Sequence, residues 1–294
     1  MQPTSLSRQK VRALVAEGEY QLASGPHPEN ARRDAQVLLL HLLQRNDPER
    51  NTAWLMAHWN SPTGHGTEFR ALIERRQNGE PIQYITGEQE FYGLPFRVTP
   101  DVLIPRPETE HLVEKALELA GGFDRPRIVD VGVGSGAIAV ALAYKLPEAR
   151  MTALDISLAA LEVASGNAER NDVQDRVRFL QSDLLTSVAD ERFEMVVSNP
   201  PYVPSTDRDS LSVEVREHEP ALALFAGEDG LDIYRRLIPA AFAVLEAGGF
   251  LLMEIGYGQS VAVGAQLQEA GFERIEFVPD LQGIPRVACG QRFA

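Results

Sequence analysis

Cysteine is nearly absent from this sequence of 294 residues, with Cys289 as its only example. One thiol cannot form an intramolecular disulfide or a cysteine-rich zinc site. Long apolar runs are missing too, since none approaches the roughly 18 residues of a membrane span. Basic residues interrupt the first segment at Arg8, Lys10 and Arg12, which differs from the apolar region of an export signal. We therefore expect a cytoplasmic protein without a membrane span.

Positively charged residues are also few: the sequence has 28 Lys and Arg against 42 Asp and Glu, for a net charge of −14. Residues 1–80 are nearly balanced, with 10 basic and 9 acidic side chains, so the remaining residues carry 18 against 33. Proteins that bind nucleic acid usually present a basic surface to the phosphates. We therefore expect no direct nucleic-acid partner. The six histidines show no paired ligand spacing, and we predict no metal site.

Apolar periodicity divides the chain into three predicted parts. Residues 1–84 show helical spacing, for example at Leu38 and Leu42, and predict a small helical bundle. Residues 85–104 alternate around a Gly-Leu-Pro turn and predict a β-hairpin linker. Residues 105–294 alternate strand-like and helical runs, which is typical of an α/β domain with a mostly parallel sheet.

The predicted α/β domain has seven strands and five helices. Strands are expected at 127–133, 150–155, 177–181, 193–198, 249–255, 274–279 and 286–290. Helices are expected at 108–119, 137–146, 158–170, 231–245 and 260–270. Since only a short turn separates the last two strands, we expect an antiparallel hairpin at the end of a parallel sheet.

A glycine-rich loop follows the first strand, in the run Asp130-Val131-Gly132-Val133-Gly134-Ser135-Gly136. At this position a doubly wound fold binds a nucleotide-like ligand, and glycines let the backbone approach it closely. The glycines are spaced two residues apart, unlike the G-x-G-x-x-G of dinucleotide sites. No pyrophosphate needs to be bound, and a carboxylate at Asp130 suits a cationic amino group. The loop therefore favours S-adenosylmethionine over NAD as cofactor.

Acidic residues follow the next two strands. Asp155 ends the second strand, where a carboxylate can accept hydrogen bonds from both ribose hydroxyls of an adenosine-bearing cofactor. Its alternative role is to cap the helix that starts at Ser157. Asp183 follows the third strand and is expected either to reach the adenine amino group or to lie in a solvated turn.

The run Asn199-Pro200-Pro201-Tyr202 ends the fourth strand. Prolines lack N–H groups and cannot continue a regular ladder, so backbone carbonyls here stay available as acceptors. The Asn199 side chain adds another acceptor, and Tyr202 adds an aromatic face. The run is therefore suited to bind a planar nitrogen in an amide or an exocyclic amino group, although Asn and Pro are also common in turns that end strands. Because its strand neighbours the first one, we expect both motifs to border one crevice.

Together these motifs resemble those of class I S-adenosylmethionine-dependent methyltransferases, and specifically the family of peptide chain release factor glutamine N5-methyltransferases. The resemblance covers nearly the whole chain and includes the runs Ile104-Pro105-Arg106-Pro107-Glu108-Thr109-Glu110 and Glu217-His218-Glu219-Pro220-Ala221-Leu222-Ala223-Leu224. It implies a Rossmann-like seven-stranded α/β domain over residues 105–294 and a helical bundle for substrate recognition at 1–84. It also implies methylation of the glutamine in the Gly-Gly-Gln motif of a release factor, with S-adenosylhomocysteine as product.

The resemblance further implies roles for individual residues. The loop Gly132–Gly136, Asp155 and Asn199 are expected to contact the cofactor, while Asn199–Tyr202 hold the glutamine. We expect Asn199 Oδ1 and the Pro200 carbonyl to accept the two amide protons. Relatives can carry an aromatic residue at position 184, where this chain has a leucine; Leu184 is expected to cover the adenine by apolar contact. We also expect Arg106 or Glu108 near the methionine end of the cofactor, and Glu254 at the product side.

Three alternatives are weighed against this interpretation. An N6-adenine nucleic-acid methyltransferase uses the same Asn-Pro-Pro-Tyr run, but the acidic domain argues against it. A ribosomal-protein glutamine methyltransferase fits less well, because the runs at 106–110 and 220–224 match the release-factor branch better. A catalytically silent binding module is expected to lack Asn199 or the glycine loop, and both are present. We expect the enzyme to be a monomer.

Overall fold

The computed structural model describes residues 9–293, and the chain divides by its contacts into two compact units. The first contains the residues up to Gly87 together with a later segment, Ser212–His218. The second contains Glu88–Leu211 and the residues from Glu219 onward. The chain therefore leaves the second unit after Leu211 and returns at Glu219, an excursion that the predicted boundaries do not include.

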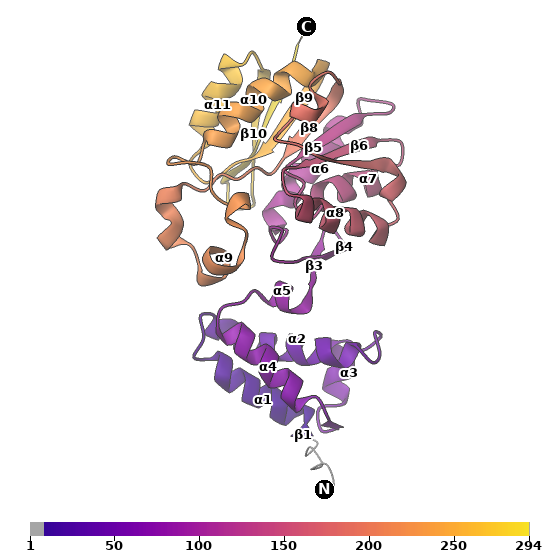
Figure 1. Cartoon of the computed structure of the whole chain (residues 1–294), viewed down its shortest axis with the longest axis vertical. Helices are drawn as coiled ribbons and strands as arrows, with labels where there is room; N and C mark the ends of the chain where they lie inside the picture. Colours follow the sequence, from indigo (N-terminus) through magenta and orange to yellow (C-terminus); the bar gives the residue numbers. More distant parts are fainter. Residues whose placement is uncertain (1–8, 294) are drawn as a thin grey trace. The chain divides into compact units, whose positions relative to one another are not determined.

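Helices make up most of the first unit (Figure 1). The apolar faces of its longer helices meet in one core, in which Leu14, Leu38 and Phe69 are fully buried. One short antiparallel pairing of two residues on each side was not predicted, because so short a strand shows no alternation. The elements are β1 (Gln9–Lys10), α1 (Val11–Leu22), η1 (Pro28–Asn30), α2 (Ala31–Gln44), α3 (Thr52–Ala57), β2 (Pro62–Thr63), α4 (Gly66–Gln77), α5 (Ile82–Thr86) and, from the later segment, α9 (Val213–His218).

A buried arginine joins the α9 segment to the first unit. Arg76 on α4 is only 5% exposed, and its Nε donates to Asp34 Oδ2 of α2 at 2.6 Å. Its Nη1 donates to the carboxylate of Glu214 on α9 and, at 3.1 Å, to the carbonyl of Glu80. A buried guanidinium requires such partners, so this cluster explains why α9 belongs with the helices.

A seven-stranded sheet organises the second unit, in the order β10-β11-β9-β8-β5-β6-β7. Strands β5 to β9 run parallel, and β11 is antiparallel to both β9 and β10, as the short last turn predicts. Strand order reverses between β8 and β5, so the ends of both strands border the crevice where such folds bind ligands. The strands are β5 (Arg127–Val131), β6 (Arg150–Asp155), β7 (Val177–Gln181), β8 (Phe193–Ser198), β9 (Leu245–Glu254), β10 (Glu273–Pro279) and β11 (Pro285–Gln291).

Helices cover both faces of the sheet, and successive strand residues point to opposite sides (Figure 1). Ile128 belongs to the core beneath the first three helices, whereas Val129 belongs to the core beneath the last two. The first group is α6 (Glu110–Ala120), α7 (Ala137–Lys145) and α8 (Leu158–Arg170), and the second is α10 (Asp232–Val244) and α11 (Ser260–Glu269). The predicted α/β class with a mostly parallel seven-stranded sheet is therefore confirmed.

The predicted hairpin forms from β3 (Glu88–Phe91) and β4 (Leu94–Arg97). It is part of the second unit, because Phe91 and Phe96 are buried in the core beneath α6, α7 and α8. The remaining elements are short 3-10 turns: η2 (Pro107–Thr109), η3 (Gln174–Arg176), η4 (Thr186–Val188), η5 (Ser205–Ser210) and η6 (Ala221–Ala223).

One strand begins earlier than its sequence indicates. Strand β9 starts at Leu245, whereas the predicted strand starts at 249. Gly248 adopts a left-handed backbone with φ of 87°, and the pairing with β8 is irregular at this point. The glycines thus form a bulge inside the strand and do not end it. Among the described helices, none is long and apolar enough to span a membrane.

Candidate active site

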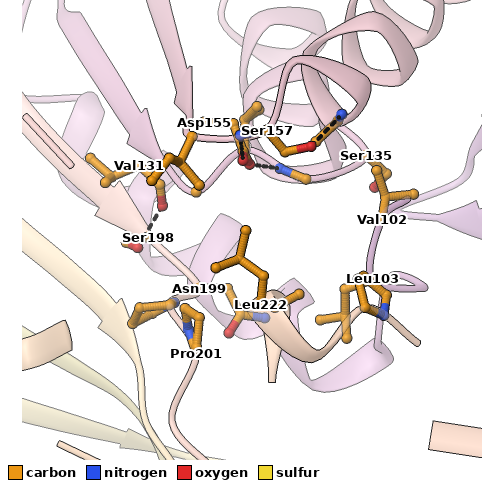
Figure 2. Close-up of a pocket in the computed structure, with 18 of the residues that line it drawn as sticks. Val102, Leu103, Val131, Ser135, Asp155, Ser157, Ser198, Asn199, Pro201 and Leu222 are labelled. Carbon is orange, nitrogen blue, oxygen red and sulfur yellow. Dashed lines mark hydrogen bonds between the residues drawn. The ribbon is translucent and has the colours of Figure 1, made fainter. Parts of the chain in front are cut away.

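The loops that follow β5, β6, β7 and β8 border one cavity of about 390 Å³, within the range of small-molecule sites. Figure 2 shows Asp155 and Ser157 on one side of this space and Asn199 and Leu222 on the other. Its walls are largely apolar. The cavity lies wholly within the second unit.

The glycine loop forms one wall, and its backbone explains its composition. Gly132, Gly134 and Gly136 have φ of 75°, 52° and 85°, a region that L side chains rarely adopt. The first two line the cavity with Val133 and Ser135. Gly136 stands outside the wall at the start of α7, where an added Cβ would lie 3.2 Å from Ala164. The third glycine is therefore needed for helix packing.

Asp130 lies behind the loop and outside the cavity wall. Its side chain is fully buried, and Oδ2 accepts a hydrogen bond from Ala139 N at 3.1 Å. Oδ1 has no hydrogen-bond partner among the described residues. Burial raises the pKa of Asp130 from 3.8 to about 7, the Ala139 N–H opposes this change, and the charge of Asp155 adds to it. Contact between Asp130 and the cofactor stays a prediction.

Asp130→Asn is expected to reduce the pH dependence of stability. The unfolded chain releases the Asp130 proton near pH 3.8, whereas the folded chain holds it until about 7, so this contribution to the unfolding free energy declines across that interval. Asparagine does not titrate. Between about pH 5 and about pH 8, calorimetry should show the variant gaining about 3 kcal/mol relative to wild type. An unchanged difference at the two pH values would contradict the raised pKa.

Asp155 is held in the cavity wall by two backbone N–H groups. Its Oδ2 accepts from Gly134 N and its Oδ1 from Ser157 N, both at 2.9 Å (Figure 2). The helix cap itself is Ser157, whose hydroxyl accepts from Ala160 N. Asp155 is thus not the capping residue, and each carboxylate oxygen keeps lone-pair capacity for a further donor.

The loop after β7 closes another side of the cavity. Asp183 and Leu184 both line it. Asp183 is exposed and forms an ion pair of 2.6 Å with Arg236 of α10, another wall residue that the sequence analysis missed. Leu184 has a φ of 52° and packs partly into the core. The wall here combines an apolar side chain with a solvated ion pair.

The Asn-Pro-Pro-Tyr run is brought to the same cavity only in part. Asn199, Pro200 and Pro201 line it, and the Ser198 hydroxyl fixes the preceding strand end by donating to the Val131 carbonyl at 2.6 Å (Figure 2). Tyr202 is outside the wall. Contact between the Tyr202 ring and a substrate nitrogen stays a prediction.

A chain of buried polar groups connects Asn199 and Tyr202. Asn199 Nδ2 lies 3.1 Å from Thr109 Oγ1, which lies 2.6 Å from Glu254 Oε2. Tyr202 donates its hydroxyl to Glu254 Oε1 at 3.0 Å. Glu254 is only 2% exposed and does not line the cavity, contrary to its expected place at the product side. Burial raises the pKa of Glu254, and the hydrogen bonds from Thr109 and Tyr202 act in the opposite direction.

The segment before α6 supplies a further part of the wall. Residues 100–103 line the cavity together with Arg106 and Thr109, whereas Glu108 does not. Arg106 pairs with the buried carboxylate of Glu219, and this pair holds the segment next to Leu222 in the wall. The run at 104–110 signals the wall, but no spacing rule shows that Thr109 contacts Asn199.

The sheet order, the glycine loop and the cavity at the strand ends define a class I methyltransferase domain. Solved structures agree on this fold. A methyltransferase from Pyrococcus furiosus superposes with a TM-score of 0.51 at 17% identity, covering 78% of this chain and 100% of its own. The hMettl16 catalytic domain superposes with a TM-score of 0.56 at 15% identity, covering 87% of this chain and 93% of its own.

Sequence comparison gives the family. The methyltransferase small domain model matches residues 109–216, and the PrmC N-terminal domain model matches residues 13–87. A release factor glutamine methyltransferase from Koribacter versatilis is 49% identical over 225 residues, 76% of this chain and 79% of the relative. Another, from Moorella thermoacetica, is 42% identical over 286 residues, which cover 96% of this chain and 98% of the relative. The chain belongs to the release factor glutamine methyltransferase family.

Proposed function

We propose that this enzyme transfers a methyl group from S-adenosylmethionine to the side-chain amide nitrogen of glutamine in the Gly-Gly-Gln motif of release factors. The observation that carries the proposal is the shared cavity: Asn199 and Pro200 line the same space as the glycine loop and Asp155. A methyl donor bound at the glycine loop would therefore lie next to an amide bound at Asn199.

The wall residues suit the proposed cofactor. Asp155 can accept from ribose hydroxyls, the backbone at Gly132 and Gly134 permits close approach, and Leu184 offers an apolar surface for the adenine. S-adenosylmethionine supplies an electrophilic methyl group on a sulfonium and is released as S-adenosylhomocysteine. The apolar part of the cavity excludes water from that group.

A primary amide nitrogen is a weak nucleophile, because its lone pair is delocalised into the carbonyl. In our proposal Asn199 Oδ1 and the Pro200 carbonyl accept hydrogen bonds from the two amide N–H groups and so orient the nitrogen toward the methyl group. The nitrogen forms a bond to the methyl carbon as the carbon–sulfur bond breaks, and the cationic N-methylated amide then releases one proton to water. The Asn199 side chain donates to Thr109 Oγ1 through Nδ2, which leaves its Oδ1 to accept from the substrate. Correct orientation of two reactants can contribute roughly 7–11 kcal/mol. The Tyr202 hydroxyl donates to Glu254, and its ring is proposed to stack on the plane of the amide.

The proposed partner is a release factor, the protein that the relatives' name identifies as their substrate. The acidic charge of −14 disfavours a nucleic-acid substrate. The helical unit, which matches the PrmC N-terminal domain, is proposed to contact the body of the release factor. Release factors act in the cytoplasm, and we place the enzyme there as a monomer.

Asp155→Ala is expected to weaken S-adenosylmethionine binding by about 10-fold to 100-fold, because a charged acceptor of hydrogen bonds is lost. Asp183→Ala is the matched control and should cost about threefold or less, since its carboxylate is exposed and already paired with Arg236. Titration calorimetry measures both dissociation constants. Equal effects of the two changes would show that Asp155 has no special role.

Transfer of labelled methyl groups tests the proposed function. The full-length enzyme is incubated with labelled S-adenosylmethionine and either a release factor, its Gly-Gly-Ala variant, or adenine-containing DNA. We expect label on the unmodified release factor alone. Label on DNA, or equal label on both release factors, would refute the proposal.

A further inference from the structure

Asn199 has a side chain whose two ends differ chemically but have nearly the same shape. Only one orientation presents the Oδ1 acceptor to the cavity, and the other presents an NH2 donor. A substrate NH2 facing a second NH2 would form no hydrogen bond. The proposed reaction therefore requires a device that fixes this amide.

Thr109 is placed to be that device. Its hydroxyl has one proton, and the 2.6 Å contact with Glu254 Oε2 uses that proton when Glu254 is a carboxylate. Oγ1 can then only accept from its other neighbour, so the atom of Asn199 at 3.1 Å must be the donor Nδ2. We infer that Thr109, held by Glu254, sets the orientation of the Asn199 amide so that Oδ1 is presented to the substrate.

Glu254 is itself fixed from several directions. Its other carboxylate oxygen accepts from the Tyr202 hydroxyl at 3.0 Å, and its backbone carbonyl accepts from the Tyr234 hydroxyl at 2.9 Å. The donor assignment of the Thr109 hydroxyl holds while Glu254 is charged, and hydrogen bonds to both of its carboxylate oxygens stabilise that form against burial. The direction of hydrogen bonding therefore runs from Asn199 through Thr109 to Glu254, and both Thr109 and Glu254 are positioning residues.

The orientation of the Asn199 amide is a property of the free enzyme. This inference rests on the proposed function only for the identity of the substrate amide that donates a hydrogen bond to Oδ1. It can therefore be measured without a substrate. In protein labelled at asparagine, NMR of the side-chain amide should show one Asn199 proton shifted downfield by the bond to Thr109. The signal is assigned by its loss in Asn199→Ala.

Three variants test the role of the hydroxyl. Thr109→Val keeps the shape but removes the acceptor, and the downfield shift should disappear. Thr109→Ser restores the hydroxyl, and the shift should return. Thr152→Val is the matched control, because Thr152 is also buried but its hydroxyl accepts from Arg178 away from the cavity. A shift that persists in Thr109→Val would overturn the inference.

Methyl transfer gives a second readout. Loss of one hydrogen bond predicts that Thr109→Val lowers kcat by about threefold to tenfold, with cofactor affinity nearly unchanged and Thr109→Ser close to wild type. Equal kcat for Thr109→Val and wild type would also overturn the inference. If wild type fails to methylate any release factor, the proposed function fails, while the NMR result still decides the orientation of Asn199.

Discussion

Asn199→Ala is expected to lower kcat on a release factor by about 100-fold to 1,000-fold, the range seen when one preorganised hydrogen-bonding group is removed from an active site. Asn199 lies in the cavity wall next to Pro200, and its loss leaves the substrate amide with one acceptor. The nitrogen is then no longer aimed at the methyl group. Steady-state kinetics with saturating S-adenosylmethionine measures the effect.

The cofactor should still bind to Asn199→Ala. Asp155 lies across the cavity from Asn199 (Figure 2) and accepts from Gly134 N, whereas the Asn199 side chain donates to Thr109. We expect the dissociation constant of S-adenosylmethionine to change by about threefold or less, the effect of at most one weak contact. A variant that keeps wild-type kcat would show that Asn199 does not bind the reacting amide.

Arg76→Ala is expected to destabilise the helical unit by about 3–5 kcal/mol, because it leaves buried carboxylates without their cation. Asp34 is nearly as buried as Arg76, and Glu214 of α9 is partly buried. The α9 segment should also detach and become sensitive to proteases, since the Arg76–Glu214 ion pair helps hold it to α4.

Arg75 provides the matched control on the same helix. It pairs with Glu80, but its side chain is 45% exposed, so Arg75→Ala should cost about 1 kcal/mol or less. Both tryptophans, Trp54 and Trp59, belong to the helical unit. Urea unfolding followed by tryptophan fluorescence therefore reports this unit alone. Equal midpoints for the two variants would contradict the buried role of Arg76.

Local patterns predicted most of the fold. Strand-like and helical runs located β5 to β11 and their helices within a few residues, because β5, β6 and β8 carry continuous buried runs and α6 and α10 each bury one face. The bulge at Gly248 and the excursion of α9 into the helical unit were missed. Both depend on contacts between residues far apart in the chain, such as Arg76 with Glu214, which no local period encodes.

The sequence predicted those parts of the site whose residues follow directly after a strand. The glycine loop, Asp155 and Asn199 line one cavity as expected, because the carboxyl ends of neighbouring parallel strands meet at one edge. Asp130, Gly136 and Tyr202 are close by in sequence but do not line the cavity. Sequence shows which residues are near the strand ends, but the side-chain direction follows from packing. Arg236 was missed because it comes from another segment. Thr109 belongs to the run at 104–110, but its contact with Asn199 was not predicted.

The central claim is that the enzyme methylates the side-chain nitrogen of one glutamine. Fragmentation mass spectrometry of a release factor, after reaction with the enzyme and S-adenosylmethionine, tests it most directly. We predict one added methyl group on the glutamine of the Gly-Gly-Gln motif, located on the side-chain amide. A methyl group on any other residue, or an unmodified motif after complete turnover of cofactor, would contradict the account.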